Sequence, residues 1–187
     1  CQRAPCAKLK PFAFADFMFS DQPHDCVRSM LKRDYSHLAI EEARGCSGDR
    51  GSLAIIGCGL KAMSQITREA IAFLKSADVV FSGLVATSPD RRWLEFMLGA
   101  PTIDLNQFYP TDPRASRFSC YVKGAEAVLR ECRRGRRVAL VSYGHPTLAD
   151  ATGELLLRRA RAEGHRVRCV AGVSSVAALQ ADLGFDA

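Results

Sequence analysis

The sequence lacks the patterns that would assign it at once to a redox, zinc-module, secreted or membrane class. None of its eight cysteines stands in CxxC spacing, which zinc modules and thiol redox sites commonly use. It contains no secretory signal pattern and no apolar run long enough to cross a membrane. We therefore expect a protein of the reducing cytoplasm with no membrane partner, in which Cys58 and Cys169 are buried thiols rather than disulfide partners.

The dinucleotide-binding fingerprint GxGxxG is also missing. Gly57 and Gly59 follow the first apolar run, but Ala62 stands where the third glycine would be. The next apolar run has no acidic residue at its end to bind a ribose. A nicotinamide or flavin ligand is therefore not expected, although the two glycines still allow a tight turn and a close approach of the backbone to a ligand.

Positive charge is in excess and concentrated in one region. The chain has 26 Lys and Arg against 20 Asp and Glu, and much of the excess lies in residues 114–137. The densest part, "RECRRGRR", is typical of the last turn of a helix, where cations oppose the helix dipole. No nucleic-acid-binding motif accompanies this charge. A nucleic-acid partner is thus the weaker interpretation, and it would show a steep salt dependence of binding.

The first 50 residues have no sustained helical or alternating pattern, and we assign them no role. The stretch "GCSGDRGS" at 45–52 has the composition of a linker. A zinc site from Cys6, His24, Cys26, His37 and Cys46 would need spacings that known zinc modules do not use. We expect no metal, and we expect the folded domain to cover residues 51–187.

After residue 50, short apolar runs alternate with helical patterns. Strands are expected at 52–57, 78–83, 102–105, 138–143 and 167–172. Helices are expected at 64–77, 88–98, 116–135 and 149–164. Such alternation predicts an α/β fold, with a mainly parallel five-stranded sheet, flanking helices and right-handed crossovers. Ligands of this architecture bind beyond the carboxyl ends of the strands.

Unusual residues stand where two of these strands end. The fourth run leads directly into Tyr143, Gly144, His145 and Pro146, a combination that stops a strand and offers several ligand-binding groups. The fifth leads into "AGVSS" and a further helix. Its serines could bind a ligand, although the simpler interpretation of Ser174 alone is a helix N-cap.

The segment after the third strand carries two tyrosines and an arginine. Arg117 and Tyr121 are four residues apart at the start of a helix and so share a face, and Tyr109 precedes them in a loop. A phenol close to an arginine has its deprotonated form favoured. The alternative is that Tyr121 belongs to the core and Arg117 to the solvated surface.

Together these segments resemble one family. "GSLAIIGCGLKAMSQITREAIAFL", "LNQFY", "SRFSCY", "VSYGHPTLAD" and "GVSSVAALQADLGFD" have the order and spacing of the tetrapyrrole methylase superfamily, the class III S-adenosylmethionine-dependent methyltransferases. The closer resemblance is to the borosin-type peptide-backbone N-methyltransferases, in which "YGHP" replaces a "GDP" loop. The resemblance covers residues 51–187 and implies the N-terminal domain of that fold.

The resemblance implies S-adenosylmethionine as cofactor. The first glycine loop, the loop at 144–148 and the serines after the fifth strand would contact it. The implied cofactor-binding residues are Gly57, Gly59, Gly144, His145, Pro146, Leu148, Ser174 and Ser175.

The resemblance also implies an acceptor side formed by Tyr109, Arg117, Tyr121 and Tyr143. Methyl transfer from a sulfonium is an in-line displacement that depends on alignment and the exclusion of water. With a peptide amide as acceptor, phenols beside an arginine could stabilise charge as the nitrogen is deprotonated. With a tetrapyrrole or another small molecule, Arg117 could instead pair with a carboxylate.

The resembled family has a second domain that closes over the cofactor, and this sequence stops before it. We therefore expect the chain alone to bind the cofactor weakly, to transfer no methyl groups, and to expose an apolar face that favours a homodimer. A non-catalytic remnant that binds cofactor or a protein partner is the alternative.

Overall fold

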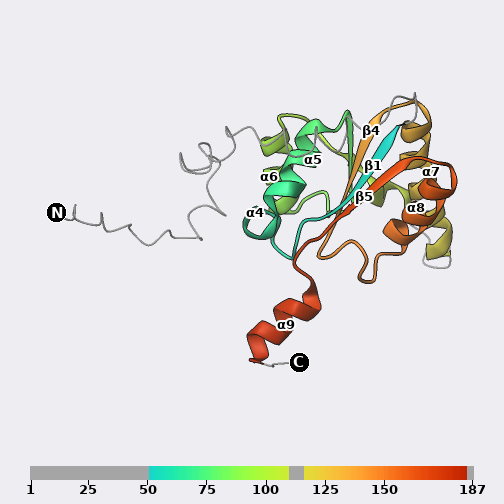
Figure 1. Ribbon diagram of the computed structural model, residues 1–187. Helices are drawn as coiled ribbons and strands as arrows, with labels where there is room; N and C mark the ends of the chain where they lie inside the picture. The colour runs from blue at the N-terminus through green and yellow to red at the C-terminus, as the bar shows by residue number, and fades with distance from the viewer. Residues whose placement is uncertain (1–50, 110–115, 185–187) are drawn as a thin grey trace, which may run out of the picture. The chain divides into compact units, whose positions relative to one another are not determined.

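The computed structural model describes residues 51–109 and 116–184 (Figure 1). They contain a five-stranded sheet in the order β3-β2-β4-β1-β5, with every pair parallel. The strands are β1 (Ser52–Gly57), β2 (Val79–Ser82), β3 (Ile103–Asp104), β4 (Arg137–Ser142) and β5 (Arg166–Val170). The predicted α/β fold with a parallel five-stranded sheet is thus confirmed. The expected linker, up to residue 50, and the conceivable zinc ligands lie outside the described residues.

Helices flank the sheet on two sides. They are α4 (Ala62–Gln65), α5 (Arg68–Ser76), α6 (Pro89–Leu98), α7 (Arg117–Arg133), α8 (Ala151–Ala162) and α9 (Ser175–Leu183), with a 3-10 turn, η1 (Leu105–Phe108). Helices α7 and α8 pack on each other on one side, and α4, α5 and α6 lie on the other (Figure 1). The connections after β1 and β4, which are neighbours in the sheet, therefore lead to opposite faces. Such a divergence leaves a crevice at the carboxyl edge of the sheet.

The largest part of the core lies between the sheet and the pair α7–α8. Leu53 and Ile55 of β1 point into it, and helix α7 contributes Val128 and Leu129. Parallel strands covered on both faces must be apolar on both, which explains why these strands read as continuous apolar runs. The apolar runs therefore located the strands well.

Two elements differ from the prediction. The expected helix at 64–77 is two helices, because Ile66 is extended and the Thr67 side chain accepts a hydrogen bond from the Ala70 amide at 3.1 Å, which starts α5. Strand β3 is shorter than expected, because the Asp104 carboxylate accepts from the Asn106 amide at 2.8 Å and starts η1. In both places a short polar side chain caps a new element inside an apolar pattern.

The basic stretch is extensively paired with acidic side chains. Arg133, in the last turn of α7, binds Glu126 and also Glu163, which directly follows α8. The strand residue Arg137 binds Asp78 at 2.6 Å. These pairs agree with the interpretation of "RECRRGRR" as the basic end of a helix.

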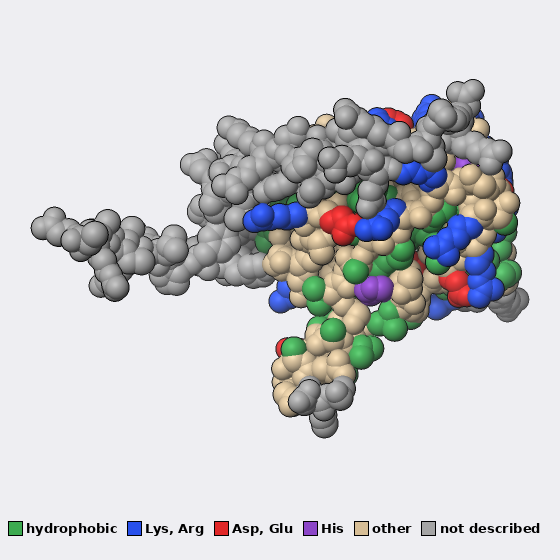
Figure 2. Space-filling view, viewed as in Figure 1, with side chains coloured by type: hydrophobic (Ala, Val, Ile, Leu, Met, Phe, Trp, Pro, Cys, Tyr) green, Lys and Arg blue, Asp and Glu red, His purple; other side chains and the backbone are tan. Residues whose placement is uncertain are grey.

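Helix α9 has no buried residue. It carries a stripe of exposed apolar side chains at Val176, Leu179 and Leu183, and hydrophobic side chains are visible on this segment in Figure 2. Ser174 caps it by accepting a hydrogen bond from the Ala177 amide at 3.0 Å, so the N-cap interpretation of Ser174 is confirmed.

Candidate active site

Four glycines let the loops after β1, β4 and β5 touch one another through their backbones. The amide of Gly59 donates to the Gly144 carbonyl at 3.1 Å, and the amide of Gly144 donates back to Gly59 at 2.9 Å. A Cβ added at Gly57 would lie 2.5 Å from the Gly144 carbonyl oxygen, and one at Gly172 would lie 2.3 Å from it. The loops predicted to meet at one edge of the sheet do so.

The loops after β1 and β4 also need glycine for their backbone angles. Gly59 and Gly144 have φ values of +77° and +72°. The Gln65 side chain fixes the first loop, because its Oε1 accepts hydrogen bonds from the amides of Leu60 at 2.6 Å and Lys61 at 3.1 Å. These turns end the strands and direct the chain away from the sheet.

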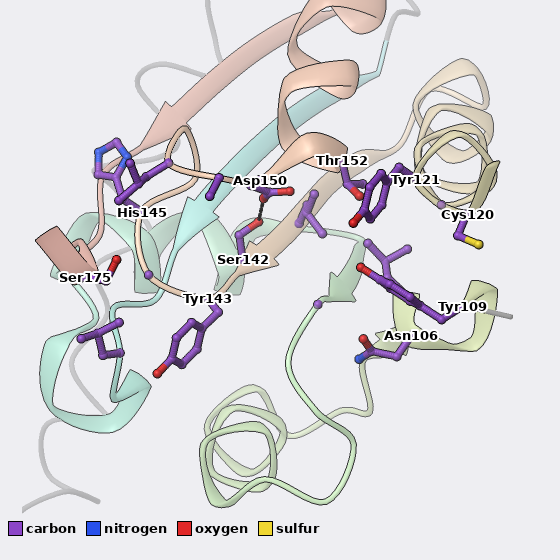
Figure 3. A pocket seen from close by; sticks show the side chains of 18 residues that line it. Asn106, Tyr109, Cys120, Tyr121, Ser142, Tyr143, His145, Asp150, Thr152 and Ser175 are labelled. Atoms are coloured by element: carbon purple, nitrogen blue, oxygen red, sulfur yellow. Dashed lines mark hydrogen bonds between the residues drawn. The ribbon is translucent and has the colours of Figure 1, made fainter. Parts of the chain in front are cut away.

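A cavity of about 340 Å³ opens beside this junction (Figure 3). The end of β4, the loop that follows it, η1 and one face of α7 form most of its wall. Its lining includes these residues implied by the resemblance: Tyr109, Tyr121, Tyr143, Gly144, His145, Leu148 and Ser175. The other five implied residues are not in its lining: Gly57, Gly59, Pro146, Arg117 and Ser174. Pro146 instead lines a neighbouring cavity.

Tyr109 and Tyr121 form the aromatic part of the wall. Their ring centroids are 6.0 Å apart and the planes meet at 78°, an edge-to-face arrangement. Burial raises the pKa of Tyr109, and Tyr121 and the charge of Asp150 add to the rise. Arg117 lowers this pKa, as the sequence predicted, but it is outweighed. Tyr109 is therefore a protonated phenol near neutral pH, because the effect of Arg117 on its pKa is the smaller one.

Tyr143 and Arg117 lie apart from that pair. The ring of Tyr143 points away from Tyr109 and Tyr121 in Figure 3 and is 58% exposed. Arg117 is the first residue of α7 and is exposed. The spacing of four residues correctly placed Arg117 and Tyr121 on one helix, but only Tyr121 reaches the cavity.

The loop after β4 is held by its own hydrogen bonds. Thr147 donates its amide to Nδ1 of His145 at 3.3 Å, and the Leu148 amide donates to the His145 carbonyl at 3.1 Å. Ala149 has a φ of +56°, a value that residues with a Cβ rarely adopt. The loop therefore keeps a defined and partly strained shape at the mouth of the cavity.

Asp150 and Ser142 are lining residues that the sequence analysis did not select. The Ser142 hydroxyl donates to Oδ2 of Asp150 at 2.5 Å, and the Gly153 amide donates to Oδ1 at 2.9 Å (Figure 3). In the sequence, an aspartate directly before a helix indicates only an N-cap, which Asp150 is for α8. Its position in the cavity wall follows from the packing of α8 against α7.

Asn106, Cys120 and Thr152 complete the polar lining. The Asn106 side chain is held by donating to the Leu84 carbonyl at 2.9 Å. Within residues 51–109 and 116–184 no three potential ligands from His, Cys, Asp and Glu are grouped in a way that would hold a metal ion. No helix in that part of the chain is long and apolar enough to span a membrane.

The fold and the cavity define the class of protein. It is an α/β domain with a parallel sheet, whose glycine loops meet beside a cavity at the carboxyl edge, where ligands of this architecture commonly bind. Residues 52–187 match the sequence model of the Tetrapyrrole (Corrin/Porphyrin) Methylases, and the chain belongs to this family.

Curated relatives agree with the resemblance to the borosin branch. A methyltransferase and type I borosin cyclic peptide precursor from Mycena rosella is 35% identical over 136 residues, which are 73% of this chain and 34% of the relative. The corresponding protein from Serendipita vermifera subsp. bescii is 36% identical over 138 residues, 73% of this chain and 33% of the relative. The chain thus spans about a third of the length of these relatives.

Solved structures support the fold. A crystal structure of diphthine synthase superposes with a TM-score of 0.57 at 19% identity, covering 72% of this chain and 49% of that one. A conserved hypothetical protein from Aeropyrum pernix K1 superposes with a TM-score of 0.53 at 24% identity, covering 68% of this chain and 40% of that one.

Proposed function

We propose that this chain is the donor-binding domain of an S-adenosylmethionine-dependent methyltransferase whose acceptor is a peptide backbone amide. The observation that supports it most is the junction of Gly57, Gly59 and Gly144 beside the cavity, in a chain that belongs to the tetrapyrrole methylases and resembles borosin precursors.

The residues present fit the methyl donor. When bound, S-adenosylmethionine supplies a methyl group on a sulfonium cation, and tyrosine rings and carboxylate oxygens favour a cation. The backbone at Gly144 is not crowded, since a Cβ placed there would only touch Leu60 Cδ2, at 3.9 Å, and the Val173 carbonyl oxygen, at 4.0 Å. The loop at 144–148 and Ser175 would hold the donor from the side of β4 and β5, with Gly57 and Gly59 shaping the floor. Ser174 would act by capping α9.

The acceptor side follows from the phenols. A protonated Tyr109, beside Tyr121, can donate a hydrogen bond to an amide oxygen. Such a bond strengthens as negative charge develops on that oxygen while the nitrogen loses its proton. Tyr143 would flank the acceptor at the open mouth, and Arg117 would act from a distance through its charge. This division of roles suits an amide better than a carboxylate-bearing acceptor.

Methyl transfer to short peptides tests the proposal. Mass spectrometry with fragmentation would locate methyl groups added to backbone nitrogens, by this chain alone and after fusion to the C-terminal region of the Serendipita vermifera relative. Donor-dependent backbone methylation by the fusion is expected, and its absence in both proteins would contradict the proposal.

Substitutions in that fusion separate acceptor chemistry from donor binding. Tyr121→Phe should slow transfer about 100-fold or more, and Arg117→Ala much less because Arg117 is exposed, while the affinity for the demethylated donor stays nearly constant in both. Equal losses of rate and affinity would mean that these side chains hold the donor or the fold instead.

A further inference from the structure

Asp150 contributes the acidic side chain in the lining of the cavity that the described residues form. It lies between the end of β4 and the start of α8, on the side where Ser142, Tyr121 and Thr152 also point inward (Figure 3). It is half-buried, so its carboxylate can meet a ligand without being fully hydrated. A ligand in this cavity must either offer the carboxylate a hydrogen-bond donor or a positive charge, or bind away from it.

Its hydrogen bonds leave capacity for a further donor. A carboxylate has about four acceptor positions, and two are used by the Ser142 hydroxyl and the Gly153 amide. In the stretches that the structure describes, no Lys or Arg lies within ion-pair distance of Asp150. The carboxylate is therefore held in place by neutral donors, with acceptor positions left for a ligand N–H.

The phenols in the same lining are poorly suited to accepting a proton. Burial raises the pKa of Tyr109, with Tyr121 and Asp150 adding to the effect, so this phenol is a hydrogen-bond donor near neutral pH. Methylation of an N–H group needs an acceptor for the proton in the same space as donors for the amide oxygen. The lining thus offers phenol donors for the amide oxygen and the Asp150 carboxylate as an acceptor for the proton.

We propose that Asp150 recognises the N–H of the methyl acceptor and takes its proton during transfer. This inference rests on the proposed function and names Asp150 as the residue that selects acceptors with an N–H at the same site. The nitrogen–methyl bond forms as the methyl–sulfur bond breaks, the electron pair of that bond stays on sulfur, and the proton passes from nitrogen to the carboxylate and then to water. Acceptors without an N–H would meet an unsatisfied carboxylate and bind less well.

Asp150 is also the N-cap of α8, and Asp150→Asn separates the two roles. Asparagine caps a helix about as well as aspartate, since its Oδ1 can accept from the Gly153 amide, but it carries no charge. Asp90→Asn is the matched control, because Asp90 lies in the first turn of α6 and outside the cavity lining. Both variants should unfold at nearly the temperature of the unsubstituted chain.

The test uses binding by the chain itself and needs no turnover. The probes are N-acetyl-valine-N-methylamide and the same molecule methylated on both amide nitrogens, which has no N–H, each titrated by NMR with the demethylated donor present. The unsubstituted chain and the control Asp90→Asn should both prefer the N–H probe about tenfold, because hydrogen bonds to charged acceptors are the stronger ones. Asp150→Asn should lose most of that preference.

Two results would overturn the inference. One is equal binding of both probes to the unsubstituted chain, and the other is a preference that survives Asp150→Asn. Failure of the proposed function is recognised separately, because then the demethylated donor itself shifts no amide signals at the glycine junction.

Discussion

At the scale of single residues, the site depends on positions that carry no side chain. Gly57 and Gly172 bring two loops to within contact of the Gly144 carbonyl, where any Cβ would overlap backbone atoms. From the sequence, a tight turn and a close backbone approach were predicted at Gly57 and Gly59, because a glycine's freedom is a property of the residue itself. Asp150 could not be found in the same way, since its role depends on which helix packs against α8.

Gly57→Ala should destabilise the chain by about 1–3 kcal/mol, because its Cβ would lie 2.5 Å from a backbone oxygen that cannot rotate away. The control is Gly124→Ala in the middle of α7, where the nearest atom would be 3.6 Å away and alanine is the better helix former. Urea titration measures both free energies of unfolding. If the two variants are equally stable, the close contact at the junction is not as described.

The pKa of Tyr109 offers a second test at this scale. Burial is the largest cause of its rise and Tyr121 the next, so Tyr121→Phe should lower this pKa toward its ordinary value. Tyr143→Phe is the control, because that ring points away from the pair (Figure 3). Ultraviolet absorbance of phenolate during alkaline titration follows the change, and an unaltered titration in Tyr121→Phe would contradict the coupling.

At the scale of elements, a buried ion cluster places the segment that carries Tyr109. The Arg91 guanidinium of α6 lies 2.8 Å from Asp104 and 3.1 Å from Glu95, and it donates to the Thr102 carbonyl at 3.1 Å. This cluster fixes α6 against β3 and the start of η1, from which Tyr109 follows. Because its members come from α6, from β3 and from the segment between them, periodicity along the chain gave no indication of it.

Glu95 makes this cluster sensitive to acid. Burial alone would raise the pKa of Glu95, but hydrogen bonds from Thr102 and Arg91 outweigh it and hold the pKa below its ordinary value. The stability gained is complete above the unfolded pKa of about 4.3 and is lost as pH falls through the lower folded value. The free energy of unfolding should therefore fall more steeply below about pH 4.5 in the unsubstituted chain than in Glu95→Gln.

Urea titrations at several pH values between about 3 and 6 measure this difference. Glu154→Gln is the control, because Glu154 belongs to an exposed pair with Arg158 that contributes little. Parallel curves for Glu95→Gln and the unsubstituted chain would show that the cluster does not hold a charged Glu95.

The elements also show how far the sequence could predict the structure. Strands 52–57 and 138–143 were located to within a residue or so, because buried parallel strands need unbroken apolar runs. The break between α4 and α5 was missed, because one capping hydroxyl at Thr67 overrides a helical pattern that continues through it. Arg117 was expected in the site, because spacing gives the face of a helix but not what that face meets.

At the scale of the whole molecule, the cavity lies at the carboxyl edge and is open to water. Tyr143 and Leu148 at its mouth are exposed, as is the apolar stripe of α9. An open site gives up part of the buried area and polar contact that a small-molecule site normally supplies. Weak binding of the donor by this chain is therefore expected. Self-association through the exposed apolar stripe stays a prediction, which analytical ultracentrifugation would test.

Titration of the ¹⁵N-labelled chain with S-adenosylhomocysteine, the demethylated donor, tests the location of the site most directly. Saturable shifts are expected at the amides of Gly59, Gly144, His145 and Ser175, with a dissociation constant in the micromolar range or weaker. The opposite edge of the sheet holds a second cavity of about 330 Å³ beside Arg137 and Arg166, which serves as an internal control. Shifts confined to that edge, or no shifts at all, would contradict a donor site at the glycine junction. Sub-micromolar binding would contradict the description of the cavity as open to water.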